Sequence, residues 1–217
     1  MKADLHIHSH HSNDSCSSVA EILQQAKERG LECIAISDHN TLGAYDDIPD
    51  DPGVIIIPAV EVSSAAGHIL AYGVTVDIER DMSVRETIDA IHAAGGLACV
   101  AHPYRMRSGI GGENVSNDFD LVEGWNSRSS RKGNRQAMSL ARSLGLPMTA
   151  GSDSHRPDTV GDAFVEITVP CRDHDDVLQA IMDGKTELGG KHRGAFATLR
   201  YAVKTVGEWI LRGCRRM

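Results

Sequence analysis

The sequence predicts an α/β fold built on a largely parallel sheet that is covered by helices. Short apolar segments alternate with stretches of helical periodicity over most of the chain. The apolar segments are continuous, as is typical of parallel strands that are buried on both faces. This pattern fits either a closed barrel or an open doubly wound sheet. No G-x-G-x-x-G turn follows the first strand, which argues against the nucleotide-binding form of the open sheet.

Eight strands and four helices are expected. Short runs rich in β-branched or small apolar residues predict strands at 3–7, 33–36, 54–60, 69–72, 97–100, 121–122, 147–150 and 163–165. The expected helices run from the capping boxes Ser18-x-x-Glu21 and Ser83-x-x-Glu86 to the glycines at 30 and 95, and over 136–144 and 175–182.

The chain of 217 residues is expected to form one barrel domain over residues 1–190, followed by a basic amphipathic helix over residues 191–217. The net charge is −8, but the C-terminal segment carries seven Lys and Arg residues against one Glu. We expect this helix to pack on the acidic body, with a membrane surface or a nucleic acid as the alternative contact. Its apolar stripe consists of Phe196, Leu199, Val203, Val206 and Ile210.

Composition excludes several classes of protein. No apolar run is long enough to be a transmembrane segment, and no signal peptide precedes the first strand, so a cytoplasmic location is expected. Five scattered cysteines without a C-x-x-C pair indicate neither a disulfide framework nor a thiolate zinc site. The acidic body argues against a broad nucleic-acid-binding surface and suits a protein that binds divalent cations.

Metal-ligand side chains occur repeatedly where the expected strands end. In a parallel barrel the C-terminal strand ends meet at one mouth, which is where active sites are built. His68 instead opens a strand, and it reaches the same mouth only if that strand is short or runs across it. The strand-end positions are His6, His8, His39, Glu61, His102, Asp153 and His155.

Imidazoles and carboxylates without thiolates suit Zn²⁺, Fe²⁺ or Mn²⁺. Two or three such ions generate a hydroxide at neutral pH and bind both the attacking and the leaving oxygen of a phosphoryl group. A single histidine beside an apolar strand is more often a hydrogen-bonded core residue. Repetition at several strand ends reverses that preference and indicates phosphoesterase chemistry.

The motifs "DLHIHS", "ISDHNT", "PAVEVSS", "GHILAYG", "VAHPYR", "LVEGWNSR" and "GSDSH" occur in that order. Over residues 3–168 this series resembles the PHP (polymerase and histidinol phosphatase) superfamily. The resemblance implies a distorted (β/α)7-type barrel with a trinuclear metal site at the C-terminal ends of the strands. It implies Zn, Fe or Mn as the divalent ions and Glu61, Asp153 and His155 as catalytic residues.

Carried over by position, the resemblance implies two sets of ligands. His6, His8, Glu61 and Asp153 would surround one ion, and Glu61 would bridge to a second that His102 also binds. His39, His68 and His155 would complete the remaining coordination. Many family members have "S-D-G" after the serine that matches Ser12, whereas Asn13 intervenes here, so the ligand aspartate is either Asp14 or absent.

Anionic substrates also need cationic side chains. Arg105 and Arg128 follow strand ends and are the expected phosphate-binding residues, because a guanidinium binds phosphate in a bidentate manner. The expected substrates are small phosphomonoesters, nucleotides or nucleic-acid ends. Two alternatives stay open: a histidinol-phosphate phosphatase, and a metal-binding PHP module with a structural or regulatory role.

Asp4 and Asp38 are expected to orient neighbouring imidazoles through the ring nitrogen that does not bind metal, or else only to support their strands. His10 and His11 are expected on the turn beyond the first strand, either solvated or facing the substrate. His92, His174 and His192 are expected to have structural roles.

Overall fold

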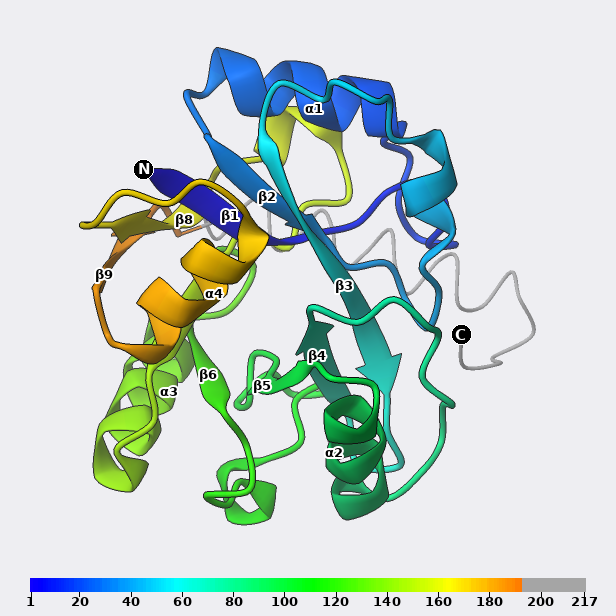
Figure 1. Cartoon of the computed structure of the whole chain (residues 1–217). Helices are drawn as coiled ribbons and strands as arrows, with labels where there is room; N and C mark the ends of the chain where they lie inside the picture. Colours follow the sequence, from blue (N-terminus) through cyan, green and yellow to red (C-terminus); the bar gives the residue numbers. More distant parts are fainter. Residues whose placement is uncertain (193–217) are drawn as a thin grey trace.

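The computed structural model describes residues 1–192, and its nine strands form one sheet in the order β7-β6-β5-β4-β3-β2-β1-β8-β9 (Figure 1). The sheet curves around an apolar interior, and the strands at its two ends approach each other. The strands are β1 (Lys2–Ile7), β2 (Cys33–Ile36), β3 (Ile55–Ser63), β4 (His68–Tyr72), β5 (Leu97–Val100), β6 (Leu121–Asn126), β7 (Met148–Gly151), β8 (Ala163–Ile167) and β9 (Thr186–Gly190).

The barrel closes between β7 and β1 at the ends of these strands. Ile7 and Ser154 form a parallel bridge. The amide of His8 donates to the carbonyl of Ser154 at 2.9 Å, and the amide of Asp153 donates to the carbonyl of His6 at 2.7 Å. The predicted α/β barrel is therefore confirmed, with β8 and β9 extending the sheet beyond β1.

Three features of the sheet differ from the prediction. β4 is antiparallel to both β3 and β5. The four residues 64–67 that join β3 to β4 are too few for a parallel crossover between these two strands. β8 is antiparallel to β1. β9 was not predicted, since its sequence, Thr-Glu-Leu-Gly-Gly, contains no apolar run.

The four predicted helices are present. α1 (Val19–Glu28) and α2 (Val84–Ala93) begin at the predicted capping boxes, in which the serine hydroxyl and the glutamate carboxylate each accept from the other residue's amide. α3 (Arg131–Leu144) begins five residues earlier than expected, because Ser130 caps its first turn. α4 (His174–Met182) begins one residue early at the cap Asp173. The short 3-10 helices are η1 (Gly43–Asp47), η2 (Gly112–Asn114) and η3 (Pro157–Thr159).

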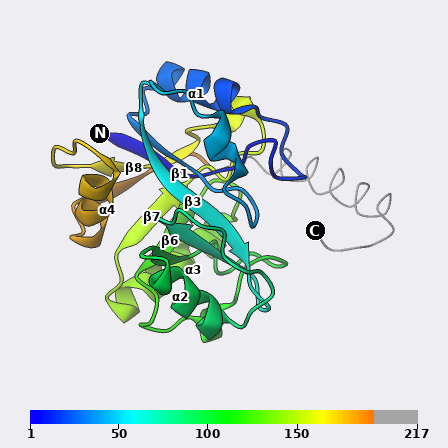
Figure 2. The same ribbon diagram turned by 45° about the vertical axis from the view of Figure 1, so that its right-hand side comes forward.

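The helices cover different parts of the sheet. In both Figure 1 and Figure 2, α1 lies at one side of the molecule, while α2 and α3 lie at the opposite side. α2 packs against β5 and α3 packs against β6. α4 takes a different position, since its apolar side chains belong to the cluster inside the barrel.

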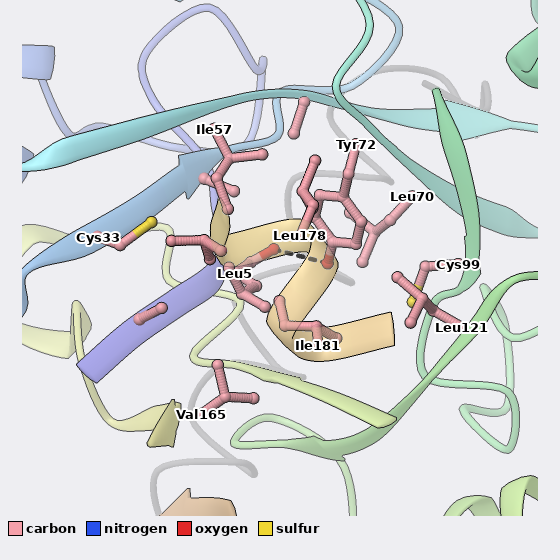
Figure 3. Packing of buried hydrophobic residues seen from close by; sticks show 14 of the residues in the cluster. Leu5, Cys33, Ile57, Leu70, Tyr72, Cys99, Leu121, Val165, Leu178 and Ile181 are labelled. Carbon is pink, nitrogen blue, oxygen red and sulfur yellow. Dashed lines mark hydrogen bonds between the residues drawn. The ribbon is translucent and has the colours of Figure 1, made fainter. Parts of the chain in front are cut away.

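The interior of the barrel is a single apolar cluster that α4 closes (Figure 3). Leu178 and Ile181 of α4 lie beside Leu5 of β1 and Tyr72 of β4. The buried hydroxyl of Tyr72 donates to the carbonyl of Leu5 at 2.9 Å, so its polar atom is satisfied. With one end of the barrel filled in this way, the other end is left for polar side chains.

The side chains of β1 change direction at the boundary between the apolar interior and the polar mouth of the barrel. Leu5 belongs to the interior cluster, whereas Ile7 packs in the cluster under α1. The register of β1 against β2 shifts between Asp4 and Ile7. Such an irregularity re-aims side chains, and it lets His6 and His8 follow Leu5 on the inner side.

The predicted amphipathic helix over residues 191–217 falls outside the described residues, apart from Lys191 and His192. The division into a barrel domain and this helix therefore stays a prediction. None of the helices described within residues 1–192 has the length and hydropathy of a membrane-spanning segment.

Replacing Ile181 with Ala should lower the free energy of unfolding by about 2–5 kcal/mol, because it removes a fully buried side chain from the closed end of the barrel. Urea denaturation followed by far-UV circular dichroism measures this change. The matched control is Met106→Ala, since Met106 is 94% exposed and its loss should change stability by less than about 0.5 kcal/mol. Equal effects of the two substitutions would contradict the closure of the barrel by α4.

Candidate metal centre

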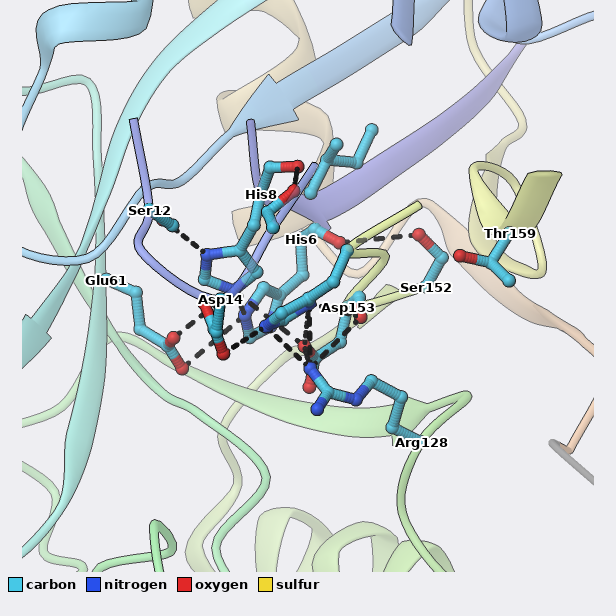
Figure 4. Close-up of polar contacts among 12 residues, drawn as sticks. His6, His8, Ser12, Asp14, Glu61, Arg128, Ser152, Asp153 and Thr159 are labelled. Carbon is cyan, nitrogen blue, oxygen red and sulfur yellow. Dashed lines mark hydrogen bonds and ion pairs between the residues drawn. The ribbon is translucent and has the colours of Figure 1, made fainter. Parts of the chain in front are cut away.

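The nine predicted ligand residues converge at the mouth of the barrel opposite α4. Figure 4 shows Asp14, Glu61 and Asp153 directed toward His6 and His8, with Arg128 beyond Asp153. Their side chains come from strands and loops spread over most of the described chain. The residues brought together are His6, His8, Asp14, His39, Glu61, His68, His102, Asp153 and His155.

The carboxylate of Glu61 lies at the centre of this group and is 1% exposed. Five imidazole nitrogens lie within 3.4 Å of its two oxygens. Oε1 faces Nε2 of His6 at 3.4 Å, Nδ1 of His68 at 3.0 Å and Nε2 of His102 at 2.9 Å, and Oε2 faces Nε2 of His8 at 3.3 Å and Nδ1 of His39 at 3.1 Å. Because different histidines face each oxygen, one carboxylate connects separate groups of ligands.

A second carboxylate, Asp14, joins the far side of the group. One of its oxygens lies 2.8 Å from Nε2 of His155, and the other lies 3.7 Å from Nε2 of His39. The intervening Asn13 therefore does not keep Asp14 away from the mouth. Asp153 approaches from β7 and lies 3.7 Å from Nε2 of His8.

The donor atoms fall into overlapping groups of the size that binds one metal ion each. Within residues 1–192, four buried or half-buried groups have donor atoms all within 4.8 Å of one another. Four residues, Glu61, His6, His8 and His39, each belong to two groups, and the two carboxylate oxygens of Glu61 suit it to connect adjacent ions. The groups are His6–His8–Glu61, His39–Glu61–His68, His8–His39–His155 and His6–His102–Asp153.

His68 reaches the mouth because β4 runs antiparallel to its neighbours. In the β3–β4 pairing, Ser63 at the end of β3 is opposite His68 at the start of β4. The first residue of β4 thus lies at the same end of the barrel as the last residues of β3. This orientation resolves how a residue that opens a strand joins residues that end strands.

The backbone at two of the ligand positions adopts a conformation that is rare for residues other than glycine. His102 has φ of 29° and Asp153 has φ of 51°. Each residue follows shortly after a strand, β5 or β7, and turns its side chain into the mouth. Non-glycine residues with positive φ carry strain, and they cluster at functional sites where the surrounding structure holds them.

Glycine at position 151 permits the close approach of β7 to β1. A Cβ atom at Gly151 would overlap the Cβ and the backbone of His6. A larger residue would therefore push apart the two strands whose ends carry His6 and Asp153.

Glu123 of β6 contacts two of the predicted ligands and was not singled out from the sequence. Its Oε1 accepts from Nδ1 of His6 at 2.9 Å and from the amide nitrogen of Asn126 at 3.0 Å, and its Oε2 accepts from the backbone N–H of His102 at 2.8 Å. A carboxylate on the second ring nitrogen fixes the tautomer of His6 and directs Nε2 toward an ion. A glutamate within an otherwise apolar buried strand was the available signal.

Asp38 acts through serines. It accepts from the hydroxyl of Ser9 at 2.5 Å and from that of Ser12 at 2.6 Å, and the Ser12 oxygen lies 3.2 Å from Nδ1 of His8. Asp38 thus orients the His8 imidazole by way of Ser12.

The expectation that Asp4 orients an imidazole was wrong. Its carboxylate accepts from the backbone N–H groups of Ser152 and Gly161, both at 2.8 Å, and from that of His6 at 3.3 Å. Asp4 therefore supports the junction of β1 with the segments around β7, which is the supporting role left open for it.

The two predicted phosphate-binding arginines both contact Asp153. Nη2 of Arg105 donates to one carboxylate oxygen at 2.5 Å and Nη1 of Arg128 donates to the other at 2.7 Å. Arg105 also donates to the side-chain oxygen of Asn126 at 2.6 Å. Both cations therefore lie at the edge of the ligand group.

The charges in the mouth favour ionised carboxylates and divide the histidines. Against the effect of burial, neighbouring carboxylates raise the pKa of His6 and His39, whereas the pKa of His8 is lowered, as are those of His102 and His155. Burial alone would raise the pKa of Asp153, but Arg105 and Arg128 hold it well below its usual range. Burial and the nearby Arg105 together lower the pKa of His102 to about 4, and burial and Arg128 lower that of His155 to about 3. Neutral imidazole and ionised carboxylate are the forms that bind metal ions.

The donor set fits divalent transition-metal ions. Among the described residues, the buried Nδ1 atoms of His39, His68 and His102 and the buried Oδ1 of Asp14 make no well-aligned hydrogen bond, although those of His39 and His68 lie 3.1 and 3.0 Å from Glu61. Such atoms are costly to bury, and coordination of a metal ion would satisfy them. The donors are nitrogen and oxygen, as Zn²⁺, Fe²⁺ and Mn²⁺ accept.

Two models of known families match the chain. A model of the PHP domain matches residues 4–96, and a model described as PHP-associated matches residues 131–186. An uncharacterized protein of Methanocaldococcus jannaschii is 35% identical over 140 residues, which cover 58% of this chain and 82% of that protein. The phosphoribosyl 1,2-cyclic phosphate 1,2-diphosphodiesterase of Eggerthella lenta is 35% identical over 83 residues, which cover 34% of this chain and 31% of that enzyme.

Solved structures share the fold at low sequence identity. A two-domain protein of Bacteroides vulgatus, described as containing a predicted PHP-like metal-dependent phosphoesterase, superposes with a TM-score of 0.73 at 15% identity over 88% of this chain and 65% of that one. The lesion-specific endonuclease EndoQ of Pyrococcus furiosus gives a TM-score of 0.66 at 18% identity over 86% of this chain and 57% of that one. The chain thus spans less than two thirds of each of these proteins.

Replacing Glu123 with Gln should weaken divalent-metal binding about 10–100-fold, because the amide holds Nδ1 of His6 less strongly than the carboxylate does. Competition with a chromophoric chelator measures the affinity. The matched control is Glu187→Gln, an exposed glutamate on β9. If Glu123→Gln binds metal as tightly as the control, Glu123 does not position the ligand.

Proposed function

Because the chain belongs to the PHP family, we propose that it is a metal-dependent phosphoesterase that hydrolyses a small phosphate ester, a nucleotide or the end of an oligonucleotide. The observation that carries this proposal is the buried carboxylate of Glu61 with imidazole nitrogens of five histidines within 3.4 Å. A structural core has no need of so many buried donors that hydrogen bonds leave unsatisfied.

In this proposal the ligand residues are shared among two or three ions. His6, His8, Glu61 and Asp153 would hold one ion, and Glu61 would share a second with His68 and His102. Asp14, His39 and His155 would hold a third. Two or three divalent ions, Mn, Fe or Zn, would supply Lewis-acid activation of water and neutralise the phosphate oxygens.

The residues of the chain prepare this chemistry in advance of substrate binding. Glu123 fixes the ring of His6, and Ser12 holds the ring of His8. Burial keeps His155 neutral, so that it is ready to act as a ligand and, with Glu61 and Asp153, to contact the reacting group. Preorganised donors of this kind lose little entropy when the substrate binds.

The arginines would bind the phosphate at the edge of the metal centre. The side chain of Arg105 is 22% exposed, and both of its hydrogen bonds are made by Nη2. A guanidinium offers five donors in a planar fork. Arg105 would therefore keep Asp153 in place and present its remaining face to a phosphate oxygen, with Arg128 on the other side of Asp153.

The relatives support the class of reaction and leave the substrate to experiment. One is a cyclic phosphate diphosphodiesterase and another is a lesion-specific endonuclease, so both act on phosphate esters. Model substrates of both ester types, an aryl phosphomonoester and an aryl phosphodiester, are therefore the first to test. A chain that binds its metal ions fully and turns over neither ester nor any nucleotide would instead be a structural or regulatory module.

Reconstituted protein should contain two or three divalent ions per chain and hydrolyse at least one of these esters. Glu61→Ala should lose metal and abolish hydrolysis, because Glu61 belongs to two of the ligand groups. His8→Ala should also abolish hydrolysis, with a smaller loss of metal. Elemental analysis and initial rates provide the readouts, and circular dichroism checks the fold. The control His92→Ala removes an exposed imidazole paired with Asp120 and should leave both readouts unchanged. One ion or none in the reconstituted wild type would refute the assignment.

Arg105→Ala should lower kcat/KM about tenfold to a hundredfold, because a charge-assisted hydrogen bond to phosphate contributes roughly 1.5–3 kcal/mol. Metal content should stay close to that of wild type, because Arg128 still contacts Asp153. Arg105→Lys should recover only part of the loss, since an ammonium group lacks the planar fork. The matched control is Arg156→Ala, an exposed arginine paired with Asp158. Rates equal to wild type in Arg105→Ala on every ester that wild type cleaves would remove Arg105 from the substrate site.

A further inference from the structure

A second group of metal-ligand side chains lies outside the buried centre. It consists of His10, His11 and Asp47, whose donor atoms all lie within 4.8 Å of one another. His10 and His11 follow β1, and Asp47 ends η1, which follows β2. β1 and β2 are parallel, so the group lies at the same end of the barrel as the buried centre. We propose that these three residues form a separate, solvent-accessible site for a zinc ion or a similar late transition-metal ion.

The distances suit a tetrahedral ion. Oδ2 of Asp47 lies 2.9 Å from Nε2 of His11 and 3.7 Å from Nε2 of His10. With metal–ligand bonds of about 2.0–2.1 Å, neighbouring ligands of a tetrahedral zinc ion are about 3.3 Å apart. The observed separations lie on either side of this value. The two imidazole rings have centroids 4.4 Å apart and planes inclined at 45°, and they present donor atoms within 4.8 Å of each other.

The backbone on the histidine side is already fixed. The amide of His10 donates to the carbonyl of Ser17 at 2.7 Å, and the amide of His11 donates to the hydroxyl of Ser9 at 3.2 Å. That hydroxyl in turn donates to the buried carboxylate of Asp38. The turn that carries the two histidines is therefore anchored to the barrel, which reduces the entropy lost when an ion binds.

The backbone on the aspartate side is fixed as well. Tyr45 of η1 is hydrogen bonded to the carbonyl of Ile36 at 2.7 Å and accepts from the amide of Ala59 at 2.7 Å. A Cβ atom at Gly43 would lie 2.8 Å from Nδ1 of His11, so the absence of a side chain there lets η1 pack closely against this ring. Backbone contacts with the barrel thus hold both loops in the positions that bring these three side chains together.

This group differs from the other exposed histidine–carboxylate contacts of the described chain. His92 with Asp120 and His174 with Asp175 each provide one imidazole and one carboxylate. Two imidazoles and a carboxylate are a common ligand set for zinc. Three protein ligands leave one coordination position open to water or to an anionic group. The side chains of His10 and Asp47 are 49% and 46% exposed, so an ion has direct access from solvent.

Zinc titration of metal-stripped protein against a chromophoric chelator tests the site. Wild type should bind one equivalent of zinc more than His10→Ala. If His10→Ala still binds zinc at this site, its affinity should be at least about tenfold lower than that of wild type. Loss of a residue that only supports a metal ligand already weakens binding by this factor. Asp47→Asn should give the same loss, because it keeps the size of the side chain and removes its charge. Cobalt in place of zinc provides a visible absorption band that should decrease by the same share in both variants.

Two controls separate this site from the buried centre. His92→Ala removes an exposed imidazole that has no second histidine beside it, and it should keep the full stoichiometry. Glu61→Ala should lose ions from the buried centre and keep the one equivalent of zinc that His10→Ala loses. The test of this site therefore does not depend on whether the phosphoesterase proposal is correct. Thermal unfolding of each metal-free variant should match that of metal-free wild type. Equal zinc stoichiometry and affinity in wild type, His10→Ala and Asp47→Asn would overturn the proposal.

Discussion

The interaction on which the rest of the structure depends is the burial of one carboxylate among imidazoles. The ionised carboxylate of Glu61 is buried, and its charge is balanced by histidines that come from β1, β4 and the loops after β2 and β5. Burial raises the pKa of Glu61, but the neighbouring His68, His6 and His39 hold it well below its usual range. A buried charge of this kind is stable only when its partners are held in place. The barrel, which brings the ends of several strands to one mouth, provides that constraint.

The closure between β1 and β7 determines both the shape of the barrel and the geometry of the site. The bridge from Ile7 to Ser154 and the hydrogen bond from Asp153 to His6 join the two strands at the ligand residues themselves. Gly151 allows the strands to approach, and the positive φ of Asp153 turns its carboxylate inward. The barrel therefore cannot close in this way without also bringing His6 and Asp153 together.

Charge is layered outward from the centre. Glu123 and Asp38 lie behind the ligands and fix the rings of His6 and His8, directly in one case and through Ser12 in the other. Arg105 and Arg128 lie on the opposite side and hold Asp153 ionised. Negative charge thus accumulates where cations are expected, and positive charge is placed where an anionic substrate is expected to enter.

The sequence by itself determined the fold class, the helix starts at the capping boxes and the strand-end positions of most ligands. These features follow from local rules, because hydrophobic periodicity identifies the elements and parallel strands send their ends to one mouth. Local pattern alone therefore suffices to place His6, His8 and His102 at that mouth.

Only the tertiary structure decided the arrangement of the remaining residues. His68 needed the antiparallel direction of β4, and Asp14 needed the path of a loop that crosses to His155. Glu123 lies within a buried strand, and Arg105, which the sequence predicted only as a phosphate-binding residue, also contacts Asp153. The physical reason is common to all four. Their roles depend on partners far away in the sequence, and the distance between such partners is set by how the sheet curves and closes rather than by any local pattern.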